Sequence, residues 1–435
     1  MQVRLPVRFG FLRALLFRPT ARNMGKVLSG NILGNGLHLV ALVILGRDLP
    51  IEQFGLYLLL HAGMMLMAQV ADFGLNTTLV KQYQDHLARS HPRQGEILLR
   101  HALQLKMVLA GVIAVSAALV AGPVSAHVLD GPDATRLFRI VCLGAWFSCI
   151  WYYCQASLQA RQRFGWHALL TAGNHALRLM LITVLWLAGR LTLEAAVWVL
   201  VLIPLFGSTC AALLWPGAFW RARSTPYDLK KNISSLFHFS KWIFLSSLTA
   251  SIILRVDIFL LGLFSDHFNV GQFGVAERFA GVFPLIAGAV SSVLLPRFAT
   301  IRSREQIGHI LDELRRLIPM LAIGLAVVML VAHPLIPFLM GAEFQPSVWV
   351  FDVLALGFSL AIVLNPLSFF CLSFDRPHWI TYMCLCQLVL NVLADVLLIP
   401  SMGAIGAAYG SLLVRIFALF YLAGALRRLL RTAEP

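Results

Sequence analysis

Twelve stretches of the chain are apolar over about 20 residues, the length that a helix needs to cross a bilayer. Hydrophobic residues make up 59% of the chain and charged residues 13%, whereas soluble domains carry about 25% charged residues. Hydrocarbon offers no partner to an open backbone, so every span must be helical. The predicted spans are residues 27–46, 54–78, 103–122, 137–158, 167–188, 194–215, 242–264, 273–295, 317–339, 348–372, 379–399 and 404–426.

The basic residues alternate between rich and nearly empty loops. Of the 35 Lys and Arg residues, 26 lie in the N-terminal arm and in every second loop after it, whereas the intervening loops contain four. By the positive-inside rule, this places both termini in the cytoplasm. The net charge of +15 is therefore concentrated on one side of the membrane, where it favours anionic lipid over nucleic acid as the partner.

A weak internal repeat divides the chain near its middle. Ile51–Leu56 matches Val270–Val275 at an offset of 219 residues, and Arg163 with Trp166 matches Arg376 with Trp379 at an offset of 213. Six spans separate the halves, so the repeats have the same orientation. We expect an all-α integral membrane protein with twelve transmembrane helices in two six-helix lobes, residues 1–236 and 237–435. A pseudo-two-fold axis would relate the lobes around a central cavity.

Polar side chains follow one face of several spans. At about 100° per residue, each of four sets forms a single stripe: Asn31, Asn35 and His38; His61, Gln69, Asp72 and Asn76; Thr171, Asn174, His175 and Arg178; and Gln387, Asn391 and Asp395. Such residues are costly in hydrocarbon, so they indicate either a functional surface or interhelical hydrogen bonds.

Charged residues also lie inside the later spans. On the seventh span, Arg255 and Asp257 would point about 200° apart on the helix and could not simply neutralise each other. Glu277 and Arg278 follow on the eighth span, and Arg415 lies on the last. Because intramembrane charges are rare, each is a candidate functional residue.

Three groups of motifs resemble the oligosaccharide flippases of the Wzx type, within the multidrug/oligosaccharidyl-lipid/polysaccharide exporter superfamily. They are Asn31–Asn35 with Phe54–Tyr57 and Ala71–Leu75; Arg255–Asp257 with Val270–Arg278 and Leu295–Pro296; and Asn391–Ile399 with Pro400–Ala408. The likeness covers nearly the whole chain. Gly274 and Val275 stand where the family usually has Gly-Tyr.

The resemblance implies a transporter of lipopolysaccharide, O-antigen or exopolysaccharide units, and not an enzyme. Its cargo would be an undecaprenyl-pyrophosphate-linked oligosaccharide that crosses the bacterial inner membrane by alternating access, and a polysaccharide polymerase would be a partner. A diphosphate needs buried cations along its path, and sugar hydroxyls need hydrogen-bonding groups. We therefore expect Arg178, Arg255, Arg278 and Arg415 to hold the headgroup. The predicted contacts to the sugars are Asn31, Asn35, Gln69, Asn76, Asn174 and Asn391.

Directional transport needs an energy source. A buried carboxylate can bind a proton or a sodium ion in one state and release it in another. The candidates for this coupling are Asp72, Asp257, Glu277 and Asp395. The sequence has no GxxxxGK[ST] loop and no HExxH motif, so we expect no cofactor, no metal site and no direct ATP hydrolysis.

Two alternatives remain open from the residues. A multidrug or cation antiporter of the same superfamily would share the lobed fold but would favour an acidic, aromatic-lined cavity. A membrane glycosyltransferase or polymerase would need catalytic residues in a substantial outer loop, and the predicted outer loops are short.

Overall fold

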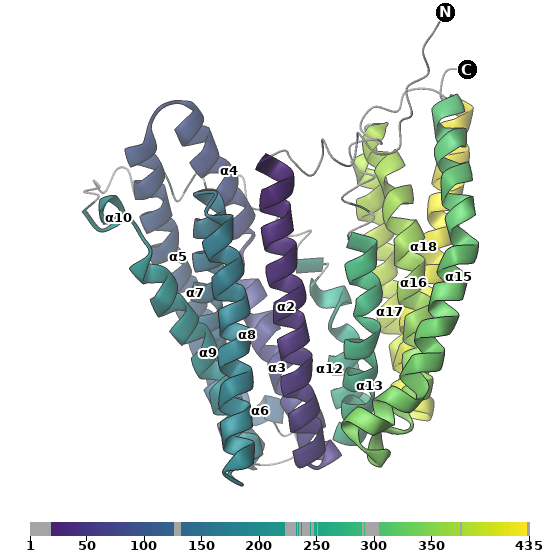
Figure 1. Ribbon diagram of the computed structural model, residues 1–435, viewed down its shortest axis with the longest axis horizontal. Helices are drawn as coiled ribbons and strands as arrows, with labels where there is room; N and C mark the ends of the chain where they lie inside the picture. Colours follow the sequence, from purple (N-terminus) through teal and green to yellow (C-terminus); the bar gives the residue numbers. More distant parts are fainter. Residues whose placement is uncertain are drawn as a thin grey trace, which may run out of the picture. The chain divides into compact units, whose positions relative to one another are not determined.

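The computed structural model describes residues 19–125, 132–221, 232, 234, 236, 244, 248–249, 251–288, 291, 304–374 and 376–432. Every regular element within these ranges is a helix (Figure 1). Ten of the helices are long and apolar enough to cross a membrane. The chain is therefore an all-α, multi-pass membrane protein, as its hydropathy predicts.

The helices fall into an earlier and a later series along the chain. The earlier ones are α2 (Pro19–Asp48), α3 (Ile51–Asp72), α4 (Leu75–Ala88), α5 (Pro92–Leu119), α6 (Ala121–Val124), α7 (Pro132–Ala160), α8 (Phe164–Leu187), α9 (Leu193–Leu213) and α10 (Gly217–Arg221). The later ones are α12 (Val256–Phe264), α13 (His267–Ala280), α15 (Arg304–Met340), the 3-10 helix η2 (Ala342–Phe344), α16 (Ser347–Ser373), α17 (Pro377–Met402) and α18 (Ala404–Thr432).

Ten of the twelve predicted spans correspond to described membrane-length helices. The predicted seventh and eighth spans, residues 242–264 and 273–295, lie partly outside the described residues, and their described parts include α12 and α13. α15 has 37 residues, about 55 Å at 1.5 Å per residue. Its apolar part is Ile318–Met340, so the preceding turns extend beyond the length that a bilayer requires.

The chain forms two compact units. Unit 1 consists of Met1–Ile44, Met67–Val120 and Arg139–Phe244, and unit 2 of Leu45–Leu66, Ala121–Phe138 and Leu245–Pro435. These units differ from the predicted lobes, because Leu45–Leu66 and Ala121–Phe138, which come early in the chain, belong to unit 2. The lobe boundary at residues 236 and 237 and the central cavity stay predictions.

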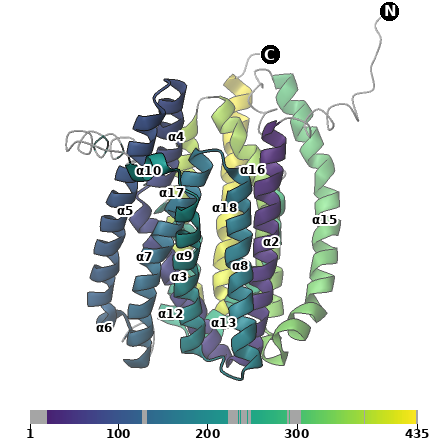
Figure 2. The ribbon, with the colours of Figure 1, turned by 60° about the vertical axis from the view of Figure 1, so that its left-hand side comes forward.

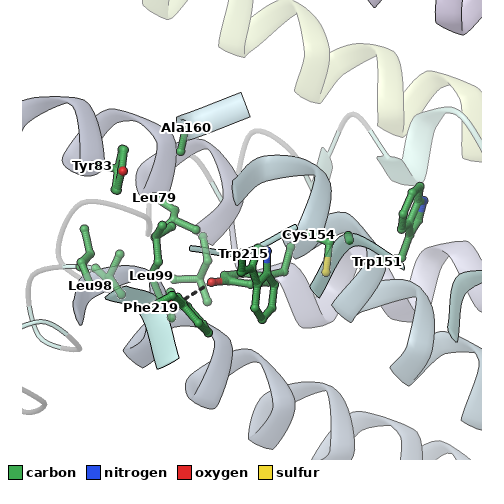
Figure 3. Packing of buried hydrophobic residues seen from close by; sticks show 14 residues of the cluster. Leu79, Tyr83, Leu98, Leu99, Trp151, Cys154, Ala160, Trp215 and Phe219 are labelled. Carbon is green, nitrogen blue, oxygen red and sulfur yellow. Dashed lines mark hydrogen bonds between the residues drawn. The ribbon is translucent and has the colours of Figure 1, made fainter. Parts of the chain in front are cut away.

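The described core of unit 1 is an aromatic cluster contributed mainly by α4, α5, α7, α9 and α10 (Figure 3). Tyr153 is fully buried and donates its hydroxyl hydrogen bond to the Leu99 carbonyl at 2.7 Å. Its ring meets that of Trp215 edge to face, with ring centroids 5.9 Å apart. The polar end of the tyrosine is thus satisfied while its ring packs, which a buried tyrosine requires.

In unit 2, α18 packs along both α16 and α17, and α13 packs on α16. The repeated motifs of the sequence also meet here. A side chain on Gly55 would collide with the His267 carbonyl, and one on Gly274 would collide with Leu58. The first turns of α3 therefore pack against α13, and Gly55 and Gly274 allow the two helices to approach closely.

Three predicted spans are broken in the structure, and the prediction of continuous helices there was wrong. The second span, predicted over residues 54–78, ends as α3 at Asp72 because Phe73 and Gly74 have positive φ values of 50° and 68°. α4 starts directly afterwards. The seventh is interrupted by a turn at Leu254 and Arg255, and α13 ends at Ala280 before Gly281.

Candidate functional site

A cluster of buried polar side chains joins α12, α17 and α18 in unit 2. The Asn391 amide donates to Asp257 Oδ1 at 2.8 Å and to Asp395 Oδ2 at 3.3 Å. The Ser411 hydroxyl donates to the second oxygen of Asp257, Oδ2, at 2.6 Å. Asp395 is 0% exposed and Asp257 7%. Two carboxylates thus share one amide in a buried place.

The local sequence explains this arrangement. Asn391 and Asp395 are four residues apart on α17, so they lie on one face of the helix. Gly410, on α18, stands directly against the Asp395 carboxylate, and any side chain at this position would collide with it. Asp395 Oδ1 has no hydrogen-bond partner within the described part of the chain.

A pocket of about 440 Å³ opens beside this cluster. Asp257, Glu277, Asn391, Ser411 and Arg415 contribute to its wall, and the remainder of its lining is largely apolar. Several polar groups that converge in a mostly apolar pocket of this size are typical of a ligand site. The sequence-predicted residues of α12, α13, α17 and α18 are therefore brought to one place.

Arg415 is held at the pocket by two contacts. Its Nη1 donates to the Ser411 carbonyl oxygen at 2.6 Å. Its guanidinium carbon lies 4.2 Å from the centroid of the Phe358 ring, an arrangement that stabilises a cation over an aromatic face. Arg255 and Arg278 also lie close enough to Glu277 to interact with its charge, as does Arg415. Three of the four predicted arginines therefore belong to unit 2 and lie near Glu277.

The outcome for Arg255 and Asp257 differs from the helical-wheel argument. Arg255 precedes α12 as its N-cap, with φ −134° and ψ −8°, so it is not on the helix that carries Asp257. The 200° separation assumed an unbroken helix and does not apply. Asp257 instead accepts hydrogen bonds from the side chains of Asn391 and Ser411.

The fourth arginine, Arg178, lies in unit 1 on α8, which runs beside α2 (Figure 2). It is 6% exposed, and its Nη1 lies 3.3 Å from His38 Nδ1 on α2. Because a guanidinium only donates, His38 must accept at Nδ1. The His38 and His175 rings are 5.6 Å apart. Asn174, the neighbouring predicted sugar contact, is buried against Gly207 of α9.

The other predicted sugar contacts are spread over α2, α3 and α4. Asn31 and Asn35 are exposed on α2, and Gln69 is half-buried on α3. Asn76 is half-buried at the start of α4 and accepts a hydrogen bond from Lys106. Within unit 1 the structure therefore does not gather all of these amides around Arg178.

The sequence analysis missed one buried cation, Lys106 of α5. Its side chain is 0% exposed, and Nζ lies 2.5 Å from Asp72 Oδ1 and 2.6 Å from Asn76 Oδ1. Asp72, a predicted ion-coupling residue, is thus ion-paired in this conformation. The available signal was in the sequence, because Lys106 is the only charged residue between His101 and Leu119.

A second buried ion pair lies where α4, α5 and α7 meet. Arg161 binds Glu96 in a bidentate manner, with Nε to Oε1 at 3.1 Å and Nη2 to Oε2 at 2.6 Å. Tyr83 donates to Glu96 Oε1 at 3.0 Å. Burial, and then the Glu96 charge, raise the pKa of Tyr83 to about 12, so the phenol remains a donor at neutral pH. Arg161, predicted to be a loop cation, is therefore part of the packed structure.

The sequence matches a known protein family. The model of the polysaccharide biosynthesis protein family matches residues 20–302. A related protein of Haloferax volcanii, the probable low-salt glycan biosynthesis flippase Agl15, is 23% identical over 404 residues, which are 90% of this chain and 80% of that protein.

Solved structures share the fold. The lipid II flippase MurJ in an inward closed conformation superposes with a TM-score of 0.74 at 14% identity, and the match covers 92% of this chain and 87% of MurJ. An inward-facing multidrug resistance transporter of the MATE family, in the MOP superfamily, gives a TM-score of 0.73 at 15% identity and covers 92% and 96%. The chain therefore has the fold of these transporters.

Proposed function

The chain belongs to the polysaccharide biosynthesis protein family, and on this basis we propose that it is a flippase that moves a lipid-linked oligosaccharide across a membrane. The relative named as a glycan biosynthesis flippase supports this function, and so does the fold shared with a lipid II flippase. We propose undecaprenyl pyrophosphate as the carrier and the bacterial inner membrane as the location, with both termini in the cytoplasm. A polysaccharide polymerase would receive the flipped unit.

The observation that carries the proposal is the charged pocket of unit 2. Asp257, Glu277 and Arg415 face a pocket that is formed by membrane-spanning helices. Charged side chains in such segments are expensive and usually mark a transport path. A passive packing role would not need a pocket, whereas a cargo with a charged head and many hydroxyl groups needs one. Arg255, Arg278, Arg415 and Arg178 are the proposed headgroup contacts.

The proposed coupling site is the cluster of Asp257, Asn391, Asp395 and Ser411. Two carboxylates that share one amide repel each other, and a bound proton or monovalent cation would relieve that repulsion. Carboxylate, amide and hydroxyl oxygens are ligands of hard cations. Within the described residues no group of three or more His, Cys, Asp or Glu side chains has metal-binding geometry, which favours a monovalent ion over a tightly bound divalent metal.

The proposal is tested by reconstitution. Proteoliposomes would contain the protein and a radiolabelled undecaprenyl-pyrophosphate-linked oligosaccharide, and flipping would be measured as the loss of label accessible to external periodate. We expect a proton or sodium gradient to accelerate flipping, and Asp257→Asn to abolish the acceleration. If the labelled lipid does not change leaflet in any gradient, the flippase proposal is wrong. If it flips at a rate indifferent to both gradients, only the coupling proposal is wrong.

A second function is favoured by one specific observation. The pocket of unit 2 has two carboxylates, Asp257 and Glu277, and two aromatic rings, Phe273 and Phe358. An acidic, aromatic-lined pocket also fits an organic cation, so an antiporter of such cations is the alternative function. Tetraphenylphosphonium, an organic cation, would compete with the labelled lipid if both bind in this pocket. If the alternative function is correct, tetraphenylphosphonium would be transported and the lipid would not. The related proteins named above are flippases and transporters, which gives a glycosyltransferase or polymerase no support.

A further inference from the structure

The break between α3 and α4 has an unusual backbone. Phe73 and Gly74 are consecutive residues in the left-handed region, with φ values of 50° and 68°. This region suits glycine but is unfavourable for phenylalanine, whose Cβ approaches its own carbonyl. The Phe73 conformation must therefore be held by contacts elsewhere.

The first of these contacts is the Lys106 ammonium group. It binds Asp72, the last residue of α3, and Asn76, the second residue of α4. One fully buried cation thus joins the residues on the two sides of the break. The distances of 2.5 and 2.6 Å leave no room for water between the groups. Lys106 itself belongs to α5, so this helix fixes the angle between α3 and α4.

The second contact is an aromatic stack. The Phe73 ring lies parallel to the Phe244 ring, with centroids 4.2 Å apart and an interplanar angle of 9°. Phe244 is the last residue of unit 1 before the chain enters unit 2 at Leu245. The chain also passes between the units at Leu66 and Met67 in α3, shortly before the break. Phe73 thus lies shortly after one point where the chain changes unit, and Phe244 lies at another such point. The stack joins these two segments of unit 1.

We infer that the Phe73–Gly74 break is a hinge, held closed by the Lys106 bridge between Asp72 and Asn76 and connected to the later half of the chain by the Phe73–Phe244 stack. Two features of the chain make it suitable as a hinge. A helix break concentrates a change of direction in a few dihedral angles, and a buried ion pair holds one geometry until its partners separate. Release of Lys106 would allow α4 to change its angle to α3. The inference goes beyond the proposed transport function and names no cargo.

A native cysteine reports the state of the hinge. Cys149 of α7 is 1% exposed and packs in one cluster with Ala71 and Ala110. It lies close enough to Lys106 and Asp72 to interact with their charges. Cys154, on the same helix, is equally buried but belongs to the separate core around Tyr153 and Trp215. Opening of the hinge should therefore expose Cys149 and leave Cys154 protected.

The test is alkylation by N-ethylmaleimide in native membranes without added cargo, with each cysteine followed by peptide mass spectrometry. In the wild-type protein, Cys149 should react far more slowly than it does after the protein has been unfolded in sodium dodecyl sulfate, because its side chain is buried. The double variant Lys106→Met/Asp72→Leu removes both charges together, so that neither is left buried alone, and it should accelerate Cys149 alkylation about tenfold, within the usual range of conformational coupling. Phe244→Leu, which removes the stack but no charge, should accelerate it in the same direction.

Matched controls separate a hinge from a general loss of packing. Phe244→Tyr retains an aromatic ring, and Lys81→Met removes an exposed lysine of α4, so both should alkylate at the wild-type rate. Acceleration of Cys154 in parallel with Cys149 would show that the whole unit has loosened, which overturns the inference. So would an unchanged Cys149 rate in both test variants, or a wild-type Cys149 that reacts as fast in native membranes as it does in the unfolded protein. Because no cargo is present, these results are independent of the flipping assay.

Discussion

At the scale of single residues, a count of charges can locate Lys106 inside a span, but it cannot identify the partners of this lysine. Of the 35 basic residues, 26 lie in the loops predicted to be cytoplasmic and four in the loops predicted to be outer, which leaves five inside the predicted spans. Four of these five are the arginines predicted to hold the headgroup, and the fifth basic residue is Lys106. Its partners, Asp72 and Asn76, were identified as polar members of the second span, but nothing in the sequence pairs them with a lysine 34 residues away.

We expect Lys106→Met alone to destabilise the protein by about 3–5 kcal/mol, because the buried Asp72 carboxyl would lose its partner. The side chains of Lys106 and Asp72 are 0% and 9% exposed, so solvent gives little compensation. The measurement is chemical unfolding in detergent. Lys106→Met/Asp72→Leu should recover most of the loss, and a single variant as stable as the wild type would contradict the role assigned to the pair.

A substitution at Gly410 tests whether the Asp395 carboxylate of the proposed coupling site binds an ion. In Gly410→Ala the new Cβ would displace the Asp395 carboxylate. If a sodium ion binds there, sodium chloride should raise the melting temperature of the wild-type protein above its value in choline chloride, since an ion that binds only the folded state stabilises it. Gly410→Ala should lose this increase. Gly424→Ala, on the same helix with open space around it, should keep it; equal sodium responses in both variants would exclude Asp395 as a ligand.

At the scale of helices, apolar length predicted the spans well and their breaks poorly. A window of about 20 apolar residues is a local property, and ten such helices are described. The break after Asp72 lies where the apolar α3 is followed by the more polar α4. Hydropathy therefore indicates the end of the apolar segment but not the left-handed turn. The Ala71–Leu75 motif was noted for its family resemblance, and its glycine is the residue that permits the left-handed turn.

Gly74→Ala should destabilise the protein by roughly 1–2 kcal/mol, because alanine is strained at a φ of 68°. Gly63→Ala is the matched control within α3, where the added methyl group has open space and alanine favours the helix. Thermal unfolding of both variants in the same detergent checks the expectation. A Gly74→Ala variant at least as stable as Gly63→Ala would mean that this backbone conformation is not required.

At the scale of the whole molecule, the alternation of basic loops predicts sidedness. Both termini should lie in the cytoplasm, since 26 basic residues lie on that side against four on the other. A green fluorescent protein fused to the C-terminus should therefore fluoresce, whereas alkaline phosphatase fused at the same place should be inactive. The opposite pair of results would reverse the topology and with it the proposed direction of transport.

The family assignment also belongs to this scale. The sequence motifs predicted an oligosaccharide flippase, and the family match over residues 20–302 confirms the family. The shared fold confirms the all-helical architecture. Of the predicted site residues, Asp257, Glu277, Asn391 and Arg415 line one pocket, whereas Arg178 lies in unit 1 with two histidines that were predicted only as members of polar stripes. The roles of these residues in transport stay predictions.

The sequence by itself determined that the chain is a helical membrane protein and where most spans lie, and its loop charges predict which side of the membrane the loops prefer. The hydropathy of a span and the charge of a loop are properties of contiguous residues, so both can be calculated from the sequence without knowledge of the tertiary structure. Only the tertiary structure decided which polar side chains meet. Asn391 and Asp257 are 134 residues apart, and Lys106 belongs to a different helix from Asp72. Their pairing depends on how the helices pack, and no periodicity of a single helix contains that information.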